Sequence, residues 1–288
     1  MTREEFSVLS AIAENQEFIR EEFNDTQQSL IHKGLLKTGG NGITAAGLQA
    51  LEPYRVKRAV FLAAGFGSRM VPITINTPKP MVRVHGKRII ETLLDAVLAV
   101  DIQEIHIVRG YLGEEFELLK TKYPMIQFIE NPEYNGTGTI SSFYHAKDLL
   151  KNAYVLESDL VVQNSGVIRK YHYTSDFLGT RMQETDDWYF KTKPDGKICE
   201  IGVGGSGNNL YKLIGISYWD GEAGRRLATD IAEAYHSTEG KKLPMSFIPF
   251  RVYPDRYDVS IMPCKETDVV EIDSFAELQE YDEAYKTT

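Results

Sequence analysis

The stretch that decides the fold is Leu62-Ala-Ala-Gly-Phe-Gly-Ser-Arg-Met70, which is followed nine residues later by Lys79 inside Thr77-Pro-Lys-Pro80. The apolar residues that lead into it are typical of a buried strand. Gly65 and Gly67 carry no side chains, so the backbone N–H groups of the turn can approach an anionic ligand. The sequence therefore predicts a strand that ends in a phosphate-binding turn.

Two familiar phosphate-binding patterns do not fit this spacing. A Walker A loop ends in Gly-Lys-Ser/Thr, and the dinucleotide fingerprint requires a third glycine at the position of Met70. Taken alone, Gly65-x-Gly67 indicates only a tight turn between a strand and a helix. The addition of Arg69 and a proline-flanked Lys79 shifts the interpretation to a nucleotide-binding turn.

From residue 56 onward, short apolar strands alternate with helical patterns, which is typical of a doubly wound α/β sheet. We expect strands at 60–62, 105–108, 127–129 and 154–156, and helices at 89–100, 113–122 and 140–150, the last capped by Thr139 or Ser141. Beyond residue 159 we expect a hairpin loop at the glycine run 202–207, a helix at 222–236, a strand at 269–272 and a helix up to Tyr285. Leu227, Ile231 and Tyr235 lie at helical spacing and are expected in the core.

The composition is that of an ordinary globular protein. With 288 residues, of which 42% are apolar, the chain can form one large core and a small additional domain. The acidic N-terminus lacks the pattern of a signal peptide, and no stretch approaches the ~18 apolar residues of a membrane span. The two cysteines form neither a disulfide framework nor a zinc site. We therefore expect a cytoplasmic protein without membrane attachment, and the net charge of −9 argues against nucleic acid as a partner.

Residues 1–55 differ from the rest and resemble a winged helix-turn-helix module, which leaves 56–288 as a second domain. Two segments, 5–13 and 26–36, have helical apolar spacing, and a glycine-rich turn at 39–42 leads into 43–51, which is similar to a wing strand and closing helix. Five Lys and Arg residues stand against eight Asp and Glu residues in 1–55, a balance of −3. Because this charge repels phosphates, we interpret the segment as a docking or regulatory module rather than a DNA reader.

Two carboxylates are candidates for a metal site. Asp159 and Asp273 each follow an apolar strand, so both are expected at the sheet edge where ligands bind. Nucleotidyl transfer requires charge neutralisation more than a proton shuttle, which favours carboxylates that bind Mg²⁺. For Asp273, capping of the helix that begins near Ser274 is the alternative. None of the six histidines stands near a second ligand or a nucleophile, and an anionic phosphate acceptor needs no general base.

The glycine turn and its lysine resemble the signature of nucleotidyltransferases that make sugar nucleotides. Over 57–286 the order of features resembles that of bacterial CTP:phosphocholine cytidylyltransferases. The stretches that carry this resemblance are 62–70, 76–79, 108–111, 131–135, 157–159, 187–188, 215–220 and 271–273. The resemblance implies a Rossmann-like sheet and a Mg²⁺-dependent enzyme that transfers CMP from CTP to a small phosphorylated acceptor. For the oligomeric state, the expectation is a homodimer.

The resemblance also implies roles for individual residues. Those implied to bind the nucleotide are Leu62, Ala63, Ala64, Gly65, Gly67, Ser68, Gly110, Tyr111, Gly138 and Thr139, with the 63–65 turn and Gly110-Tyr111 at the cytosine. Lys79 is implied to bind the α-phosphate, with Arg69 as a second catalytic residue. Asp159 and Asp273 are implied to bind Mg²⁺.

The acceptor site is implied by Asp187-Trp188, because an indole face attracts a quaternary ammonium while a carboxylate balances its charge. Glu184 is a further candidate for this site, and packing of Trp188 in the core is the alternative. Phosphocholine is therefore the first expectation for the acceptor. Two stretches, 135–139 and 243–250, depart from the family pattern, and the second lacks the aromatic and acidic cluster of a choline pocket. This departure makes 2-aminoethylphosphonate the second expectation.

An alternative of another class is a regulator that senses a nucleotide through the transferase domain without catalysis. The presence of Lys79, Asp159 and Asp273 together argues against it, because a sensor needs no pair of metal ligands.

Overall fold

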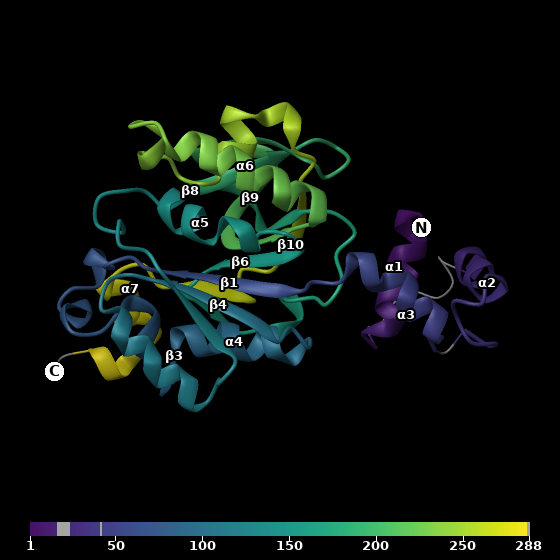
Figure 1. Cartoon of the computed structure of the whole chain (residues 1–288), viewed down its shortest axis with the longest axis horizontal. Coiled ribbons are helices and arrows are strands. Elements are labelled where there is room, and N and C mark those ends of the chain that lie inside the picture. Colours follow the sequence, from purple (N-terminus) through teal and green to yellow (C-terminus); the bar gives the residue numbers. More distant parts are fainter. Residues whose placement is uncertain (16–23, 41, 287–288) are drawn as a thin grey trace. The chain divides into compact units, whose positions relative to one another are not determined.

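The computed structural model describes residues 1–15, 24–40 and 42–286, which form two compact units (Figure 1). The first unit contains Met1–Val56 together with Arg169–Tyr173, and the second contains Lys57–Ile168 and Thr174–Thr288. In the described part of the chain, no helix is both long and apolar enough to cross a membrane.

The second unit is built on a mixed seven-stranded sheet with the strand order β10-β8-β9-β6-β1-β4-β5. Its strands are β1 (Arg58–Ala63), β4 (Glu104–Arg109), β5 (Ile126–Glu130), β6 (Ala153–Glu157), β8 (Asp176–Thr192), β9 (Ile198–Trp219) and β10 (Ser260–Cys264). Strands β6, β1, β4 and β5 are parallel neighbours, whereas β9 runs antiparallel to both β6 and β8. The four strands expected from the sequence before residue 159 are confirmed as β1, β4, β5 and β6.

Helices cover both faces of this sheet, which confirms the doubly wound α/β class (Figure 1). They are α4 (Ile89–Ala99) on one face, α5 (Ile140–Ala146) and α6 (Gly221–Tyr235) on the other, and α7 (Phe275–Tyr281) near the end of the chain. Leu227, Ile231 and Tyr235 of α6 are buried in one core with the strand residues Val60 and Val155. The apolar stripe of α6 therefore packs on the sheet, as expected.

Two small sheets complete this unit. They pair β2 (Arg83–Val84) with β3 (Lys87–Arg88) and β7 (Leu160–Val162) with β11 (Val269–Glu271), both antiparallel. The second pairing matters for the site, because the N–H of Ile272 also donates to the carbonyl of Asp159 at 3.3 Å. Residues just after β6 and just after β11 are thereby held side by side.

Two expected helices are shorter or tighter than the sequence predicts. The segment Gly113–Thr121 is a 3₁₀-helix, because its buried residues Gly113, Phe116 and Leu119 repeat every three residues and thus lie on one face of that tighter helix. Helix α5 ends at Ala146 and is followed by a 3₁₀ turn at Lys147–Leu149.

Thr139 stands at the N-cap position of α5, as expected, but its side chain does not cap the helix. The hydroxyl of Thr139 makes no capping hydrogen bond and instead accepts the N–H of Met245 at 3.3 Å. The hydroxyl of Ser141 donates to the carbonyl of Gly138. The Thr139 side chain therefore connects the start of α5 to the loop that contains Met245 instead of capping the helix.

The glycine run at 202–207 is not a hairpin loop but lies within β9. A Cβ at Gly202 would stand 2.5 Å from the hydroxyl oxygen of Tyr189, and one at Gly205 would stand 2.7 Å from its ring. These glycines let the strand cross the face of a tyrosine of β8, so their small size serves packing rather than a turn.

The first unit contains α1 (Arg3–Ala13), α2 (Asn24–His32) and α3 (Ala45–Leu51), with an isolated antiparallel bridge between Leu36 and Ile43. Its core includes Phe6, Leu9, Leu30 and Leu51, and Tyr171 from the 169–173 segment packs into it. Asn41 of the expected turn lies outside the described residues. The winged-helix assignment of residues 1–55 remains a prediction.

Candidate active site

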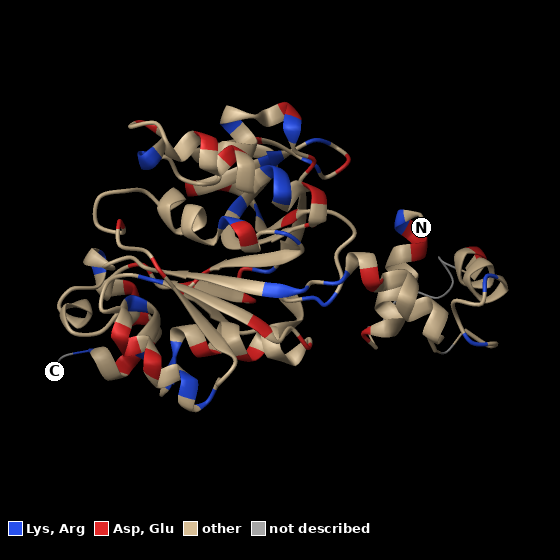
Figure 2. Ribbon diagram, viewed as in Figure 1, with Lys and Arg blue, Asp and Glu red and all other residues tan. Residues whose placement is uncertain are grey.

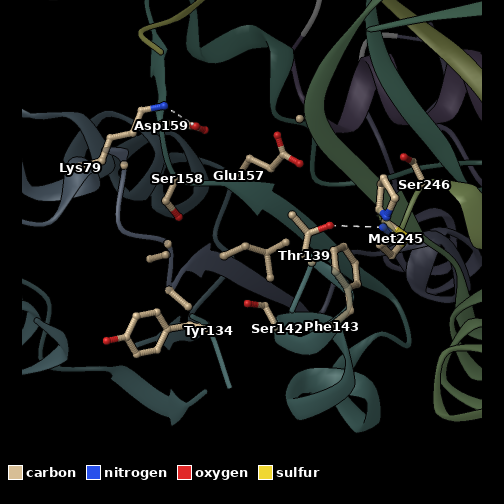
Figure 3. Close-up of a pocket in the computed structure, with 18 of the residues that line it drawn as sticks. Lys79, Tyr134, Thr139, Ser142, Phe143, Glu157, Ser158, Asp159, Met245 and Ser246 are labelled. Carbon is tan, nitrogen blue, oxygen red and sulfur yellow. Dashed lines mark hydrogen bonds and ion pairs between the residues drawn. The ribbon is translucent and has the colours of Figure 1, made fainter. Parts of the chain in front are cut away.

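A pocket of about 710 Å³ opens at the carboxyl ends of β1 and β6 (Figure 3). The residues of the sequence prediction that line it are Leu62, Ala63, Ala64, Gly65, Gly67, Ser68, Arg69, Lys79, Gly138, Thr139, Asp159, Asp187, Trp188 and Asp273. The chain therefore folds so that the glycine turn, the lysine and the carboxylates face one cavity at the edge predicted for ligands of such a sheet.

The glycine turn is shaped by its contact with Lys79. Gly67 has a φ of 67°, which a side chain would strain, and a Cβ there would stand 2.9 Å from the Cβ of Lys79. The hydroxyl of Thr74 donates to the carbonyl of Gly67 at 2.9 Å and fixes the turn from the other side. Glycine at 67 thus lets Lys79 approach the glycine turn closely.

Lys79 lies between the two aspartates of the prediction. Its Nζ is 2.7 Å from Asp159 Oδ2 and 2.7 Å from Asp273 Oδ1, and the side chain is only 9% exposed. Figure 3 shows the contact with Asp159. Burial lowers the pKa of Lys79, but the charges and hydrogen bonds of the two aspartates outweigh it and raise the pKa above its ordinary value. Lys79 is therefore a fixed positive charge.

Arg69 and Asp273 extend this ion-pair network toward the rim. Arg69 Nη2 is 2.9 Å from Asp273 Oδ1, and the arginine side chain is 68% exposed. Capping of α7 is carried out by Ser274, whose hydroxyl accepts the N–H of Glu277, so the Asp273 carboxylate is not the cap. The Asp273 carboxylate instead forms ion pairs with both Arg69 and Lys79.

Two glutamates that the sequence prediction missed complete a carboxylate cluster. One oxygen each from Glu157, Asp159 and Glu271 lies within 4.8 Å of the others. Among the described residues, Asp159 Oδ1 is buried and has no hydrogen-bond partner. Carboxylate oxygens are the ligands that divalent cations such as Mg²⁺ prefer, so this cluster fits a metal ion.

The electrostatics of the cluster agree with that fit. Burial, followed by the charges of Asp159 and Glu271, raises the pKa of Glu157 to about 8. Burial, followed by the charges of Asp159 and Asp273, raises the pKa of Glu271 to about 7. Gly215 makes room for this crowding, because a Cβ there would stand 2.4 Å from Glu157 Oε2. A bound cation would relieve the repulsion.

Asp187 and Trp188 line another part of the pocket. Asp187 Oδ1 accepts the N–H of Trp188 at 2.7 Å, and Asp187 Oδ2 is 2.9 Å from Nζ of Lys212. The indole of Trp188 packs edge-on against Phe247 with ring centroids 5.6 Å apart. Glu184 is exposed, pairs with Ser206 across β8 and β9, and lies outside the pocket lining. The structure therefore brings the Asp-Trp pair to the pocket but not Glu184.

Gly110 and Tyr111 support the glycine turn from behind rather than lining the pocket. The N–H of Tyr111 donates to the carbonyl of Ala64 at 3.0 Å, and its hydroxyl donates to carbonyls of the 73–75 segment. A Cβ at Gly110 would stand 2.7 Å from the ring of Tyr134, which lines the pocket in its place. Tyr134 is thus a pocket residue that the sequence prediction missed.

Comparisons with known proteins identify the family of the chain. Residues 58–193 match the nucleotidyl transferase family. The chain is 35% identical over 230 residues to a 2-aminoethylphosphonate cytidylyltransferase of Lancefieldella rimae, a match that spans 79% of this chain and 92% of that protein. It is 30% identical over 218 residues to the choline-phosphate cytidylyltransferase of Haemophilus influenzae, spanning 75% of this chain and 92% of that protein.

Solved structures of cytidylyltransferases are also similar to this chain. The CTP:phosphocholine cytidylyltransferase of Streptococcus pneumoniae superposes with a TM-score of 0.73 at 30% identity, covering 81% of this chain and all (100%) of that chain. An inositol-1-phosphate CTP transferase of T. maritima shares the fold, with a TM-score of 0.64 at 14% identity over 80% of this chain and 94% of that chain. The chain therefore belongs to the nucleotidyl transferase family, among its cytidylyltransferases.

Proposed function

We propose that this chain transfers CMP from CTP to a small phosphonate or phosphomonoester that carries an amino group, with release of pyrophosphate. The observation that carries the proposal is the Lys79 ammonium, fixed between Asp159 and Asp273 beside the glycine turn. A buried cation at that place meets the phosphate chain of a nucleotide held by the N–H groups of the turn.

The reaction is a displacement at the α-phosphorus of CTP. An anionic oxygen of the acceptor forms the new bond, the bond from the α-phosphorus to the oxygen bridging to the β-phosphate breaks, and pyrophosphate leaves with that electron pair. Since the attacking oxygen is already anionic at neutral pH, the step needs no general base. Lys79 stabilises the negative charge at the α-phosphate, and the largely exposed Arg69 reaches phosphate oxygens at the rim.

We propose Asp159 and Asp273 as the residues that hold Mg²⁺, with Glu157 and Glu271 beside them. Both aspartates already lie 2.7 Å from one cation, the Lys79 ammonium, and the buried Asp159 Oδ1 has no partner among the described residues. When bound, the metal ion neutralises part of the triphosphate charge and helps to align the phosphates. The chain's own contribution is to fix these carboxylates at the end of β6 and after β11.

For the acceptor, we place 2-aminoethylphosphonate ahead of phosphocholine. The carboxylates of Glu157 and Glu271 line the pocket beside the proposed metal ligands, and their oxygens can also receive N–H donors. A primary ammonium has three such donors, whereas a trimethylammonium has none and depends on aromatic faces. Phe143 and Phe177 are buried in the core, 3% and 4% exposed, so Trp188 is more accessible than either of these two rings that line the pocket with it. The Lancefieldella relative supports the same order.

Four acceptors tested with CTP separate these possibilities. We expect kcat/KM for 2-aminoethylphosphonate and for phosphoethanolamine to exceed that for phosphocholine by about tenfold or more, because three methyl groups remove every N–H donor. Phosphoethanolamine is the matched control, since it differs from phosphocholine only in those methyl groups. The fourth acceptor, 2-hydroxyethylphosphonate, lacks the positive charge and should also be poor. Pyrophosphate release measures each rate, and a preference for phosphocholine would reverse the proposed order.

The N-terminal unit is proposed to act in docking or regulation rather than in DNA recognition. Two of its basic side chains are paired with acids within the unit, Lys33 with Glu5 and Arg55 with Glu52. Figure 2 shows Lys and Arg interspersed with Asp and Glu along the ribbon of this unit. Among the described residues, these pairs partly neutralise the charge that would replace the counterions of a phosphate backbone.

We accordingly expect the full-length protein to show no salt-sensitive, sequence-selective binding to duplex DNA. The measurement is fluorescence anisotropy of labelled duplexes at about 50 and 200 mM salt, a range over which true phosphate contacts change affinity by orders of magnitude. A steep salt dependence together with discrimination between sequences would instead support a DNA-binding regulator.

A further inference from the structure

The pairing of β8 with β9 is interrupted where the acceptor end of the pocket is formed. Thr185 pairs with Gly205 and Trp188 pairs with Val203, so two residues of β8 stand opposite the single residue Gly204. Gly204 has a φ of 62°. This is a β-bulge, and a bulge re-aims the side chains beside it because the ladder hydrogen bonds are locally lost.

Side chains replace the missing ladder bonds at this bulge. The N–H of Asp187 donates to the hydroxyl of Thr185 at 3.2 Å, and the N–H of Trp188 donates to Asp187 Oδ1 at 2.7 Å. The other oxygen of the same carboxylate, Oδ2, is 2.9 Å from Nζ of Lys212. The Asp187 carboxylate thus connects the backbone of Trp188 to a lysine on β9.

Lys212 is well placed to hold that carboxylate. It belongs to the regular part of β9, where it pairs with Thr180 on one side and Tyr189 on the other. Its side chain is 30% exposed, and the neighbouring residue Leu213 lines the pocket. Burial lowers the pKa of Lys212, but the hydrogen bond and charge of Asp187 outweigh it and raise the pKa. Burial raises the pKa of Asp187, but Lys212 and the Trp188 N–H outweigh it and lower the pKa.

We infer that Lys212 is a positioning residue for the acceptor, which acts by fixing Asp187 and through it the bulge that presents Trp188 to the pocket. Each oxygen of Asp187 already has one protein partner, the Trp188 N–H or the Lys212 ammonium, so the carboxylate is held in place where it lines the pocket. The inference rests on the proposed function only in assigning this end of the pocket to the acceptor.

The test is Lys212→Met, which keeps the length of the side chain and removes its charge. We expect KM for 2-aminoethylphosphonate to rise about tenfold, comparable to the loss of one cation–aromatic contact, with KM for CTP nearly unchanged. Lys212→Arg should largely restore the acceptor KM because it restores the ion pair. Lys191→Met is the matched control, since Lys191 is a partly exposed lysine of β8 paired with Glu200 and lies outside the pocket lining.

A spectroscopic measurement tests the same inference without turnover. The chain has two tryptophans, and Trp219 is fully buried, 0% exposed, so collisional quenching by acrylamide reports mainly on Trp188. Quenching should increase in Lys212→Met and stay unchanged in Lys191→Met. If no acceptor were active, the proposed function would be wrong. The quenching measurement would still show whether Lys212 positions Trp188, because it does not depend on turnover.

Asp187→Asn provides a second variant should Lys212→Met fold poorly. It keeps an oxygen for the Trp188 N–H but removes the ion pair, so it should raise the acceptor KM and increase quenching. Because both residues act as one unit, the double variant should be no worse than either single variant. Unchanged quenching and acceptor KM in the single variants, or additive losses in the double variant, would overturn the inference.

Discussion

Replacing Asp159 with asparagine should nearly abolish cytidylyl transfer, lowering kcat by ~10³-fold or more. Asp159 serves two groups at once: one oxygen holds Lys79 at 2.7 Å, and the other is buried, without a partner in the described chain, within the carboxylate cluster. Loss of a carboxylate ligand removes several kcal/mol of charge stabilisation in metal-assisted phosphoryl chemistry, which corresponds to a factor of this size. The concentration of Mg²⁺ required for half-maximal rate should rise at the same time.

Pyrophosphate release measured over a Mg²⁺ titration checks this expectation. Asp273→Asn should act in the same direction, because its carboxylate shares the Lys79 ammonium and does not cap α7. Asp148→Asn is the matched control, as Asp148 is a 90% exposed acid of a surface turn. A variant of Asp159 that kept a normal Mg²⁺ titration and most of its kcat would exclude the carboxylate from metal binding.

The positions of Asp159 and Asp273 could be predicted from the sequence because they depend only on the residues that immediately precede each aspartate. Each follows a short apolar strand, and side chains at strand ends meet at one edge of a sheet. The same reasoning could also have predicted Glu157 and Glu271 as residues of the site. Each is the last residue of a strand and stands two residues before an aspartate, so the glutamates lie at the same strand ends as the aspartates. The strand ends therefore point to four acids around one cavity rather than two.

Other features could not be predicted because they depend on partners distant in sequence. The sequence predicts a loop at Gly202 and Gly205, because it does not show that Tyr189 of β8 packs against them. Gly215 is small because Glu157 lies against it, and Tyr134 replaces Tyr111 at the pocket because Gly110 leaves room for its ring. The 169–173 segment, which packs with the N-terminal helices, shows no local sign of belonging there.

Replacing Lys79 with methionine should lower kcat by ~10²–10³-fold with a smaller change in KM for CTP. The ammonium is preorganised by two carboxylates at 2.7 Å each, and charge stabilisers fixed in this way act mainly on the transition state. Methionine keeps the volume of the buried side chain, so the contact with the glycine turn is largely retained. Steady-state rates of pyrophosphate release at saturating acceptor measure the effect.

The Mg²⁺ dependence distinguishes the lysine from the aspartates. In Lys79→Met the carboxylates of Asp159 and Asp273 lose the ammonium that lies between them, so a divalent cation no longer competes with it and half-saturation should occur at lower Mg²⁺. Asp159→Asn should shift the same titration in the opposite direction. Lys193→Met, at an exposed turn, serves as the control for loss of a lysine charge. A Lys79 variant within threefold of the parent kcat would remove this residue from the mechanism, whereas opposite Mg²⁺ shifts in the two variants would show that lysine and metal ion share the same pair of carboxylates.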